Sequence, residues 1–220
     1  MNLSFKIKKT LLSIRDKYIK LLHNRINYKN RKRLKNKDCT IICSNCLGGF
    51  IYHWLGMKFN SPFINIYMEN NDYIKALENF DEFIESDIKE YTGTDISFPV
   101  GIGVHGEKIY FMHYTDFKSA KEKWDERKKR INKNNMCVIL ANLGEGLNSK
   151  GERLEIIDRF KALPFRNKII LTGDEINDNV IYNLKNFNED SQFIYSYDKY
   201  GRRFIDQFDY VEFINSVIEK

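Results

Sequence analysis

Prolines, long apolar runs and cysteines spread along the chain in pairs are all scarce in this sequence. It has 3 prolines in 220 residues, and no linker rich in proline, glycine or serine divides it, which favours a single folded domain. No apolar run approaches the roughly 20 residues of a transmembrane helix. Near the start, Arg15 interrupts the apolar run at 11–14, which is too short for a signal peptide.

The four cysteines do not form the pattern of a secreted disulfide framework. Cys39, Cys43 and Cys46 lie close together and Cys137 stands apart, whereas a disulfide-stabilised domain spreads paired cysteines through a small, loop-rich chain. We therefore expect reduced thiols and a cytoplasmic location.

Acidic residues are almost absent from the first 37 positions. Residues 1–37 hold 13 lysines and arginines and one acid, Asp16, so the remaining chain carries 23 basic and 29 acidic residues, a net charge of −6. A nucleic-acid-binding domain is more often basic on its folded face as well. Nucleic acid is therefore not an expected partner.

The basic segment predicts an amphipathic helix over residues 5–35. Apolar residues recur there at helical spacing with lysines and arginines between them. They are Ile7, Leu11, Ile14, Tyr18, Leu21 and Leu22. We divide the chain into a basic helical arm, 1–37, and a domain, 38–220. The arm either packs on its own domain, with its charges in water, or docks on an anionic membrane surface or a partner helix.

From residue 39, short apolar runs alternate with helical patterns. The predicted strands are 39–43, 63–68, 100–104, 108–112, 136–141, 168–172 and 192–197. The predicted helices lie around 50–55, 71–84, 116–132 and 152–163, with a weaker one after Thr172 and a last one that buries Val211, Ile214 and Ile218. This alternation predicts an α/β fold, a mostly parallel sheet with helices on both faces. The hairpin at 100–112 makes the sheet mixed.

The first candidate site is the turn Ser44-Asn45-Cys46-Leu47-Gly48-Gly49. It follows a strand and opens a helix, where ligands bind in open α/β sheets. Gly48 and Gly49 allow backbone N–H groups to approach a ligand, and a thiol at a helix start has a lowered pKa. Cys46 is a candidate nucleophile and Asn45 a candidate oxyanion donor. The alternative is a tight turn that needs small residues.

Two shorter patterns carry less weight. Cys43-x-x-Cys46 has the spacing of a metal or redox pair, but zinc needs about four ligands and no second cysteine pair exists. Gly101-x-Gly103-x-x-Gly106 matches a dinucleotide fingerprint, but a strand follows it where the fingerprint needs a helix. We expect no metal site, and the residues do not identify a cofactor.

The second candidate site combines a histidine at a strand end with one face of the following helix. His113 ends the strand, and Trp124, Arg127 and Arg130 lie on the helix. Two arginines near a histidine can hold a phosphate or carboxylate. The alternative is a salt-bridged surface helix on which Trp124 is a core anchor.

Together these motifs resemble those of a known bacterial family of unknown function. Their order is Ser44-Asn45-Cys46-x-Gly48-Gly49-x-x-Tyr52, Pro62, Phe111-x-His113-Tyr114 and Ala120-x-x-x-Trp124-x-x-Arg127-x-x-Arg130-Ile131-Asn132. The family pattern has an Asn and a Trp where this chain has Ser44 and Leu47. Its members are often labelled exopolysaccharide biosynthesis proteins, so the resemblance implies a role in surface-polysaccharide assembly and no particular reaction.

The expected function is therefore a group transferase, acyl or glycosyl, of glycan biosynthesis. Cys46 or Asn45 would act at the reacting group, with His113 as general base. Ser44, Gly48, Gly49 and Trp124 would bind the glycan or activated donor, with Arg127 and Arg130 on the donor phosphate. Residues 1–37 would hold the protein at the inner membrane surface. The alternative is a non-catalytic ligand-binding or scaffolding protein of the same assembly.

Overall fold

A four-stranded parallel sheet forms the centre of the computed structural model, which describes residues 3–93, 96–144, 147, 149–189 and 191–218. Its strands are β1 (Thr40–Cys43), β5 (Met136–Ala141), β6 (Lys168–Thr172) and β7 (Ile181–Asn183), in the order β1-β5-β6-β7. All adjacent strands pair in parallel. The predicted α/β class with a mostly parallel sheet is confirmed.

Alternate residues of each strand enter two different hydrophobic cores, one on each face of the sheet. On one face Ile41 and Cys43 pack with α2 (Leu47–Leu55) and α7 (Tyr210–Asn215). On the other face Ile42 packs with α3 (Asn70–Glu78), α4 (Phe80–Glu85), α5 (Phe117–Lys128) and α6 (Lys150–Ala162). Helices therefore cover both faces of the sheet.

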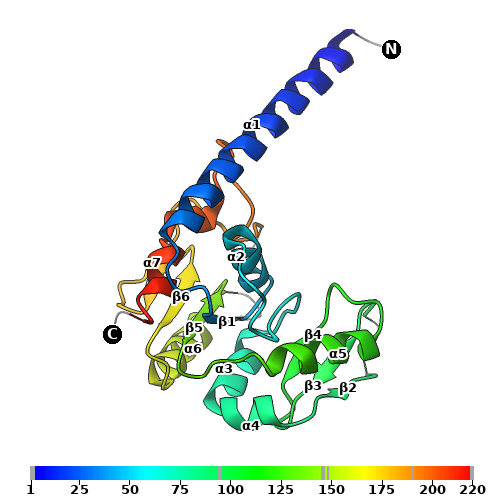
Figure 1. The fold of residues 1–220 in the computed structure, drawn as a ribbon, viewed down its shortest axis with the longest axis vertical. Helices are drawn as coiled ribbons and strands as arrows, with labels where there is room; N and C mark the ends of the chain where they lie inside the picture. Colours follow the sequence, from blue (N-terminus) through cyan, green and yellow to red (C-terminus); the bar gives the residue numbers. More distant parts are fainter. Residues whose placement is uncertain (1–2, 94–95, 145–146, 148, 190, 219–220) are drawn as a thin grey trace.

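A second, antiparallel sheet lies at the far end of the molecule from the N-terminus (Figure 1). It contains β2 (Lys89–Glu90), β3 (Val100–Ile102) and β4 (Lys108–Tyr110). The predicted hairpin is its β3–β4 pair, so the hairpin forms a sheet of its own and does not extend the parallel one. Tyr67 links the two sheets, because it bridges to Tyr110 while the next residue, Met68, donates its N–H to Ser44 O at 2.9 Å.

The N-terminal helix α1 (Leu3–Arg33) projects from the body, and only its second half lies against it (Figure 1). His23 Nε2 lies 2.8 Å from Gly201 O, Asn30 Nδ2 donates to Tyr210 Oη at 2.9 Å, and Arg31 Nε donates to Trp54 O at 2.7 Å. None of the described helices has the length and apolarity to cross a membrane.

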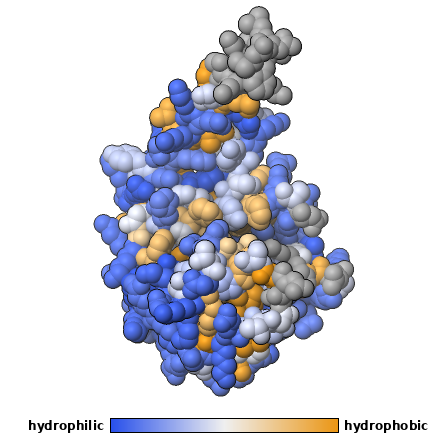
Figure 2. All heavy atoms as spheres, turned by 90° about the vertical axis from the view of Figure 1, so that its right-hand side faces the viewer, coloured by the Kyte–Doolittle hydropathy of each residue, from blue (hydrophilic) through white to orange (hydrophobic). Residues whose placement is uncertain are grey.

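Between positions 11 and 21, most apolar side chains of α1 are exposed. Leu11, Ile14, Tyr18 and Leu21 are all more than half exposed, and hydrophobic side chains show between hydrophilic ones along this helix (Figure 2). The side chain of Ile7 lies outside the described ones. Whether residues 1–37 form a separate unit stays a prediction.

Two predicted strands are absent from the described segments that contain them. In 63–68, Asn65 has a φ of 61°, a left-handed conformation that interrupts an extended run. In 192–197 the backbone pairs locally, with Ile205 N donating to Ile194 O and Phe204 N to Ser196 O, so it never reaches the sheet.

At the C-terminal side, two further elements differ from the prediction. The segment after Thr172 forms bends and then β7, with no helix among its described residues. Val211 and Ile214 are buried in α7, but Ile218 lies beyond the helix and is 54% exposed.

Candidate active site

The turn after β1 places Cys46 directly before the first residue of α2. The helix begins at Leu47, earlier than the sequence pattern predicted. Asn45 Oδ1 accepts a hydrogen bond from Leu47 N at 3.0 Å, which satisfies one of the free N–H groups of the first turn. This bond fixes the plane of the Asn45 amide, and Nδ2 makes no hydrogen bond within the described part of the chain.

Ser44 ties the ends of two parallel strands together. Its hydroxyl accepts from Ala141 N at 3.1 Å and lies 3.3 Å from Ala141 O, to which it donates. The side chain is 2% exposed. In this structure Ser44 therefore holds the turn in place, and its predicted contact with substrate stays a prediction.

The two glycines of the turn allow α2 to lie close to its neighbours. A Cβ on Gly48 would lie 2.9 Å from Cys43 Cβ, and one on Gly49 would lie 3.4 Å from Ile64 Cγ2. Close approach of the helix to β1 therefore requires Gly48. This agrees with the alternative interpretation, in which the turn needs small residues for packing.

The structure brings the Cys46 thiol and the His113 imidazole together. Cys46 Sγ lies 3.3 Å from His113 Nε2, although the two residues are 67 positions apart. Sγ also lies 3.7 Å from Ile66 O. His113 follows β4 and is exposed, whereas Cys46 is 8% exposed. The predicted proximity of the two groups is confirmed.

Burial raises the pKa of the Cys46 thiol above its usual value of 9.0, and the Cys46 backbone N–H opposes this only in part. The expectation of a lowered pKa is therefore wrong, because burial disfavours the charged thiolate. The thiol is the resting form at neutral pH. With Nε2 unprotonated, the S–H group donates toward His113, which places a base at the proton that must leave.

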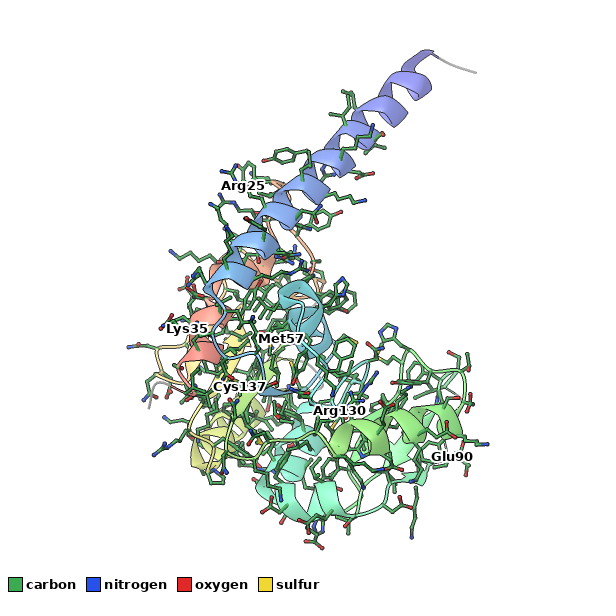
Figure 3. All side chains as sticks on the ribbon, viewed as in Figure 1. Arg25, Lys35, Met57, Glu90, Arg130 and Cys137 are labelled. Carbon is green, nitrogen blue, oxygen red and sulfur yellow. The ribbon has the colours of Figure 1, made fainter. Side chains whose placement is uncertain are left out.

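Arg127 and Arg130 bind the backbone of the segment that follows α2. Arg127 Nη1 donates to Ile64 O at 3.3 Å and to Tyr114 Oη at 3.0 Å. Arg130 Nη1 donates to Phe59 O at 3.0 Å and lies between α5 and the centre of the molecule (Figure 3). Both guanidiniums hold segment 59–64 against α5, and their predicted role on a donor phosphate stays a prediction.

Trp124 belongs to the core. It is 1% exposed, and its ring packs against those of Phe63, Phe83 and Phe111 with centroids 5.5–6.2 Å apart. It thus packs in the core beneath the segments that carry Arg127 and His113, as the core-anchor alternative describes. Among the described residues no three His, Cys, Asp or Glu side chains gather to hold a metal.

Sequence reasoning missed one contributor to this site, the segment around Asn65. Its left-handed conformation turns the chain so that Ile66 O reaches the Cys46 thiol. An Asn between isoleucines in an apolar run is the signal that could have found it, because Asn tolerates positive φ better than other non-glycine residues.

Comparison with known proteins places most of the chain in one family. Residues 17–215 match the family described as Domain of unknown function (DUF1919). The chain belongs to this family. An uncharacterised protein of Haemophilus influenzae is 34% identical over 194 residues, which cover 86% of this chain and 90% of that protein. Membership of a family of unknown function, predicted from the motifs, is confirmed. The DUF1919 match begins inside α1, so the second half of that helix belongs with the family domain.

Proposed function

We propose that this DUF1919 protein is a group transferase of surface-polysaccharide biosynthesis, in which Cys46 is the nucleophile and His113 its general base. The observation that carries the proposal is the 3.3 Å contact between Cys46 Sγ and His113 Nε2. A nucleophile and a base in such contact are the minimum equipment of covalent group transfer. The polysaccharide context rests on the resemblance of the motifs from Ser44 to Asn132.

Acyl transfer is the reaction that this pair supports best. As Cys46 Sγ attacks the carbonyl carbon of an acyl donor, the S–H proton passes to His113 Nε2, and the leaving group then takes that proton as the C–X bond breaks. The acyl group rests on sulfur as a thioester. A sugar hydroxyl then attacks the thioester carbonyl, gives its proton to His113, and returns the thiol by way of the protonated imidazole.

Asn45 is suited to stabilise the oxyanion of this reaction. Its Oδ1 is held by Leu47 N, so Nδ2 is oriented before any substrate arrives, and a preoriented donor loses little reorganisation energy. The amide precedes the nucleophile by one residue, and we assign it the developing negative charge on the acyl oxygen.

One observation favours a second candidate, a non-catalytic ligand-binding protein of the same assembly. Cys46 is 8% exposed and its pKa is raised, so the thiol is a weak nucleophile wherever His113 does not remove its proton. In that case the surface around Cys46 and His113 would bind a glycan without bond formation.

Glycan production in a strain deleted for this chain separates the two functions. Complementation with Cys46→Ala or His113→Ala should reduce production by ~100-fold or more if the pair is catalytic, because removing a nucleophile or a general base costs at least that factor. Cys39→Ala, which changes another buried thiol, is the matched control and should retain production. Folding of each variant is checked by thermal unfolding.

Mass spectrometry of the purified protein provides the second readout. Under turnover the Cys46 peptide should carry an acyl mass that hydroxylamine removes, and His113→Ala should abolish it. Full glycan production by folded Cys46→Ala and His113→Ala proteins would leave the binding role as the function.

A further inference from the structure

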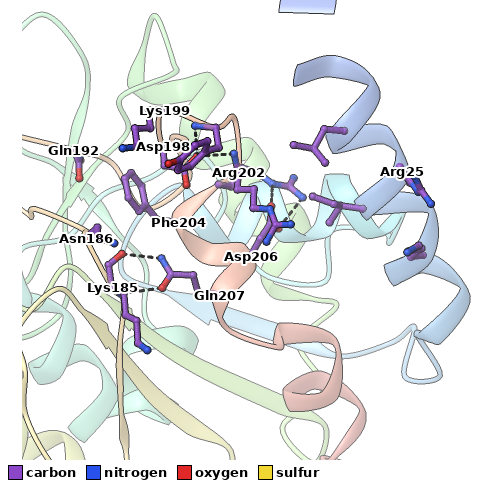
Figure 4. A pocket seen from close by; sticks show the side chains of 15 residues that line it. Arg25, Lys185, Asn186, Gln192, Asp198, Lys199, Arg202, Phe204, Asp206 and Gln207 are labelled. Atoms are coloured by element: carbon purple, nitrogen blue, oxygen red, sulfur yellow. Dashed lines mark hydrogen bonds and ion pairs between the residues drawn. The ribbon is translucent and has the colours of Figure 1, made fainter. Parts of the chain in front are cut away.

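A large basic cavity lies between α1 and the segment 185–207 (Figure 4). Its volume is about 1040 Å³, at the upper end of the range of roughly 300–1,000 Å³ that small-molecule sites occupy. The α1 wall consists of Leu22, Arg25, Ile26 and Lys29. The cavity shares no lining residue with the turn at Cys46 or with His113, so it is a separate site.

Positive charge is concentrated around this cavity. Six of its lining residues are basic and two are acidic. The basic residues are Arg25, Lys29, Lys185, Lys199, Arg202 and Arg203. Arg25 and Lys29 come from the basic segment 1–37, whereas the other four come from residues 38–220, which as a whole carry a net charge of −6. The four basic residues on the body side are therefore not a consequence of the composition of the body. A concave wall of one sign concentrates anions.

Both carboxylates of the lining are already engaged inside the protein. Asp206 forms a paired contact with Arg203, from Nε and from Nη2, at 2.9 Å each. Asp198 Oδ1 accepts from the backbone N–H groups of Tyr200 and Arg202 at 2.8 and 3.0 Å. No acid of the described chain forms an ion pair with the other five cations, so their charge is available to a ligand.

Arg203 lines the cavity and has one hydrogen-bond donor without a partner in the described part of the chain. It is 2% exposed, its guanidinium lies 3.8 Å from the centroid of the Trp54 ring, and Nη2 also donates to Asn27 Oδ1. Its Nη1 is buried and has no hydrogen-bond partner within the described residues. A buried N–H group without a partner is costly, so an anion or water that reaches Nη1 would satisfy it.

We propose that this cavity binds a phosphate- or diphosphate-bearing anion. Guanidinium groups match phosphate oxygens in pairs, and ammonium groups add point charge. The volume exceeds that of a diphosphate, so Leu22, Ile26 and Phe204 can receive an organic group attached to it. The ligand is either soluble or the headgroup of an anionic lipid. Binding here requires neither Cys46 nor His113 and is independent of the proposed reaction.

Calorimetric titration of the full chain with inorganic pyrophosphate tests the proposal. Lys185→Gln/Arg202→Gln, which changes two exposed lining residues, should weaken pyrophosphate binding by about tenfold or more, since two charge-assisted contacts are lost. The matched control is Lys118→Gln/Lys129→Gln, which removes the same charge from exposed positions of α5 and its C-cap. It should change the affinity by less than about twofold.

Vesicles of phosphatidylglycerol and phosphatidylcholine then distinguish the two sources of the ligand. If the lining variant sediments with them as the wild type does, the ligand is a soluble phosphate compound. If the lining variant is released and pyrophosphate displaces the wild type, the ligand is a lipid headgroup. A wild-type chain that fails to bind pyrophosphate, or equal weakening in the lining and control variants, would overturn the proposal.

Discussion

At the residue scale, Gly48 sets how closely the helix that carries the Cys46 turn lies on β1. An added Cβ would meet Cys43 Cβ at 2.9 Å, and both atoms are anchored to backbone. We therefore expect Gly48→Ala to lower the free energy of unfolding by about 1–3 kcal/mol through overpacking. Urea unfolding monitored by circular dichroism measures the change.

Gly151 is the matched control for this substitution. It also lies in the first turn of a helix, α6, but the nearest atom to an added Cβ is Ser149 Oγ at 3.8 Å. Gly151→Ala should therefore raise the free energy of unfolding by up to about 1 kcal/mol, because alanine loses less backbone entropy. If both substitutions shift stability in the same direction, the close approach at Gly48 does not determine its identity.

The raised pKa of Cys46 makes a second prediction at this scale. Alkylation requires thiolate, so the rate at which iodoacetamide modifies Cys46 should rise tenfold per pH unit through neutral pH and level off only above pH 9, the usual pKa of the group. Peptide mass spectrometry follows the rate. A plateau near pH 7 would show that the thiolate forms at neutral pH and that burial does not determine the pKa of Cys46.

At the element scale, the sequence predicts some strands to the residue and misses others. Strands β5 and β6 have the predicted bounds. Met136–Ala141 is buried at every residue, and the last three residues of Lys168–Thr172 are buried, as is typical of strands inside a parallel sheet. The run 63–68 looks equally apolar, but it pairs only at Tyr67. The apolar content of a run does not show whether the run can pair with the free edge of a neighbouring strand.

The candidate site shows the same division between local and distant information. The Ser44–Gly49 turn could be found from a strand followed by small residues, and its partner His113 from a strand end. The engagement of Arg127 with Ile64 O could not be found, because it depends on how segment 59–64 folds over α5. The basic cavity was missed for a related reason, since its walls come from α1 and from a segment about 160 positions later.

Helix α1 carries an exposed stripe of apolar side chains that contact with another surface would remove from water. Leu11, Ile14, Tyr18 and Leu21 recur at alternating steps of three and four and are 58–69% exposed. Pairing with a second copy would place Arg15 and Lys17, which flank the stripe, against like charges. An anionic membrane surface accepts both the apolar side chains and the flanking cations.

Substitution of this stripe should release the chain from anionic vesicles. Leu11→Ser/Leu21→Ser should weaken the binding constant for the vesicles by about tenfold or more, because each buried leucine contributes ~1.5–3 kcal/mol. The fraction of the chain that sediments with the vesicles measures this change. Leu154→Ser/Val104→Ser, two exposed apolar residues of the body, is the control and should sediment as the wild type does. Sedimentation unchanged by the stripe substitutions would remove the membrane role of α1.

The structure also determines which truncation is informative. Residues 23–33 contact the body through His23, Asn30, Arg31 and Arg33. Removal of 1–37 would therefore expose part of the core that packs around Ile41 and Cys43. Removal of 1–18 deletes most of the stripe and leaves these contacts in place.

At the scale of the whole molecule, the candidate active site lies where the two sheets meet. Cys46 follows β1 of the parallel sheet, and His113 follows β4 of the antiparallel sheet. The only strand-like contact between the described parts of the sheets runs through Tyr67 and Tyr110, with Met68 N on Ser44 O. The spacing of thiol and imidazole therefore depends on how the two sheets dock, and not on either sheet alone.

Stability of the molecule should fall at alkaline pH, because its core holds neutral groups that ionise once exposed. Burial raises the pKa of Cys43 to about 12 from 9.0, against the weaker lowering effect of backbone N–H groups at Asn45 and Gly48. It also raises the pKa of Tyr52. A raised acid pKa means that the folded state keeps a proton that the unfolded state loses, so the contribution is fully present below pH 9 and is lost above it.

For Cys43 alone the free energy of unfolding should decrease by about 1.4 kcal/mol per pH unit between pH 9 and pH 12. Urea midpoints at closely spaced pH values measure the slope. Cys43→Ala leaves a small cavity and lowers stability at every pH, but its slope should be shallower than that of the wild type by one proton. Parallel curves for the two proteins would mean that the Cys43 thiol ionises in the folded state as readily as in water, and that the core around β1 admits solvent.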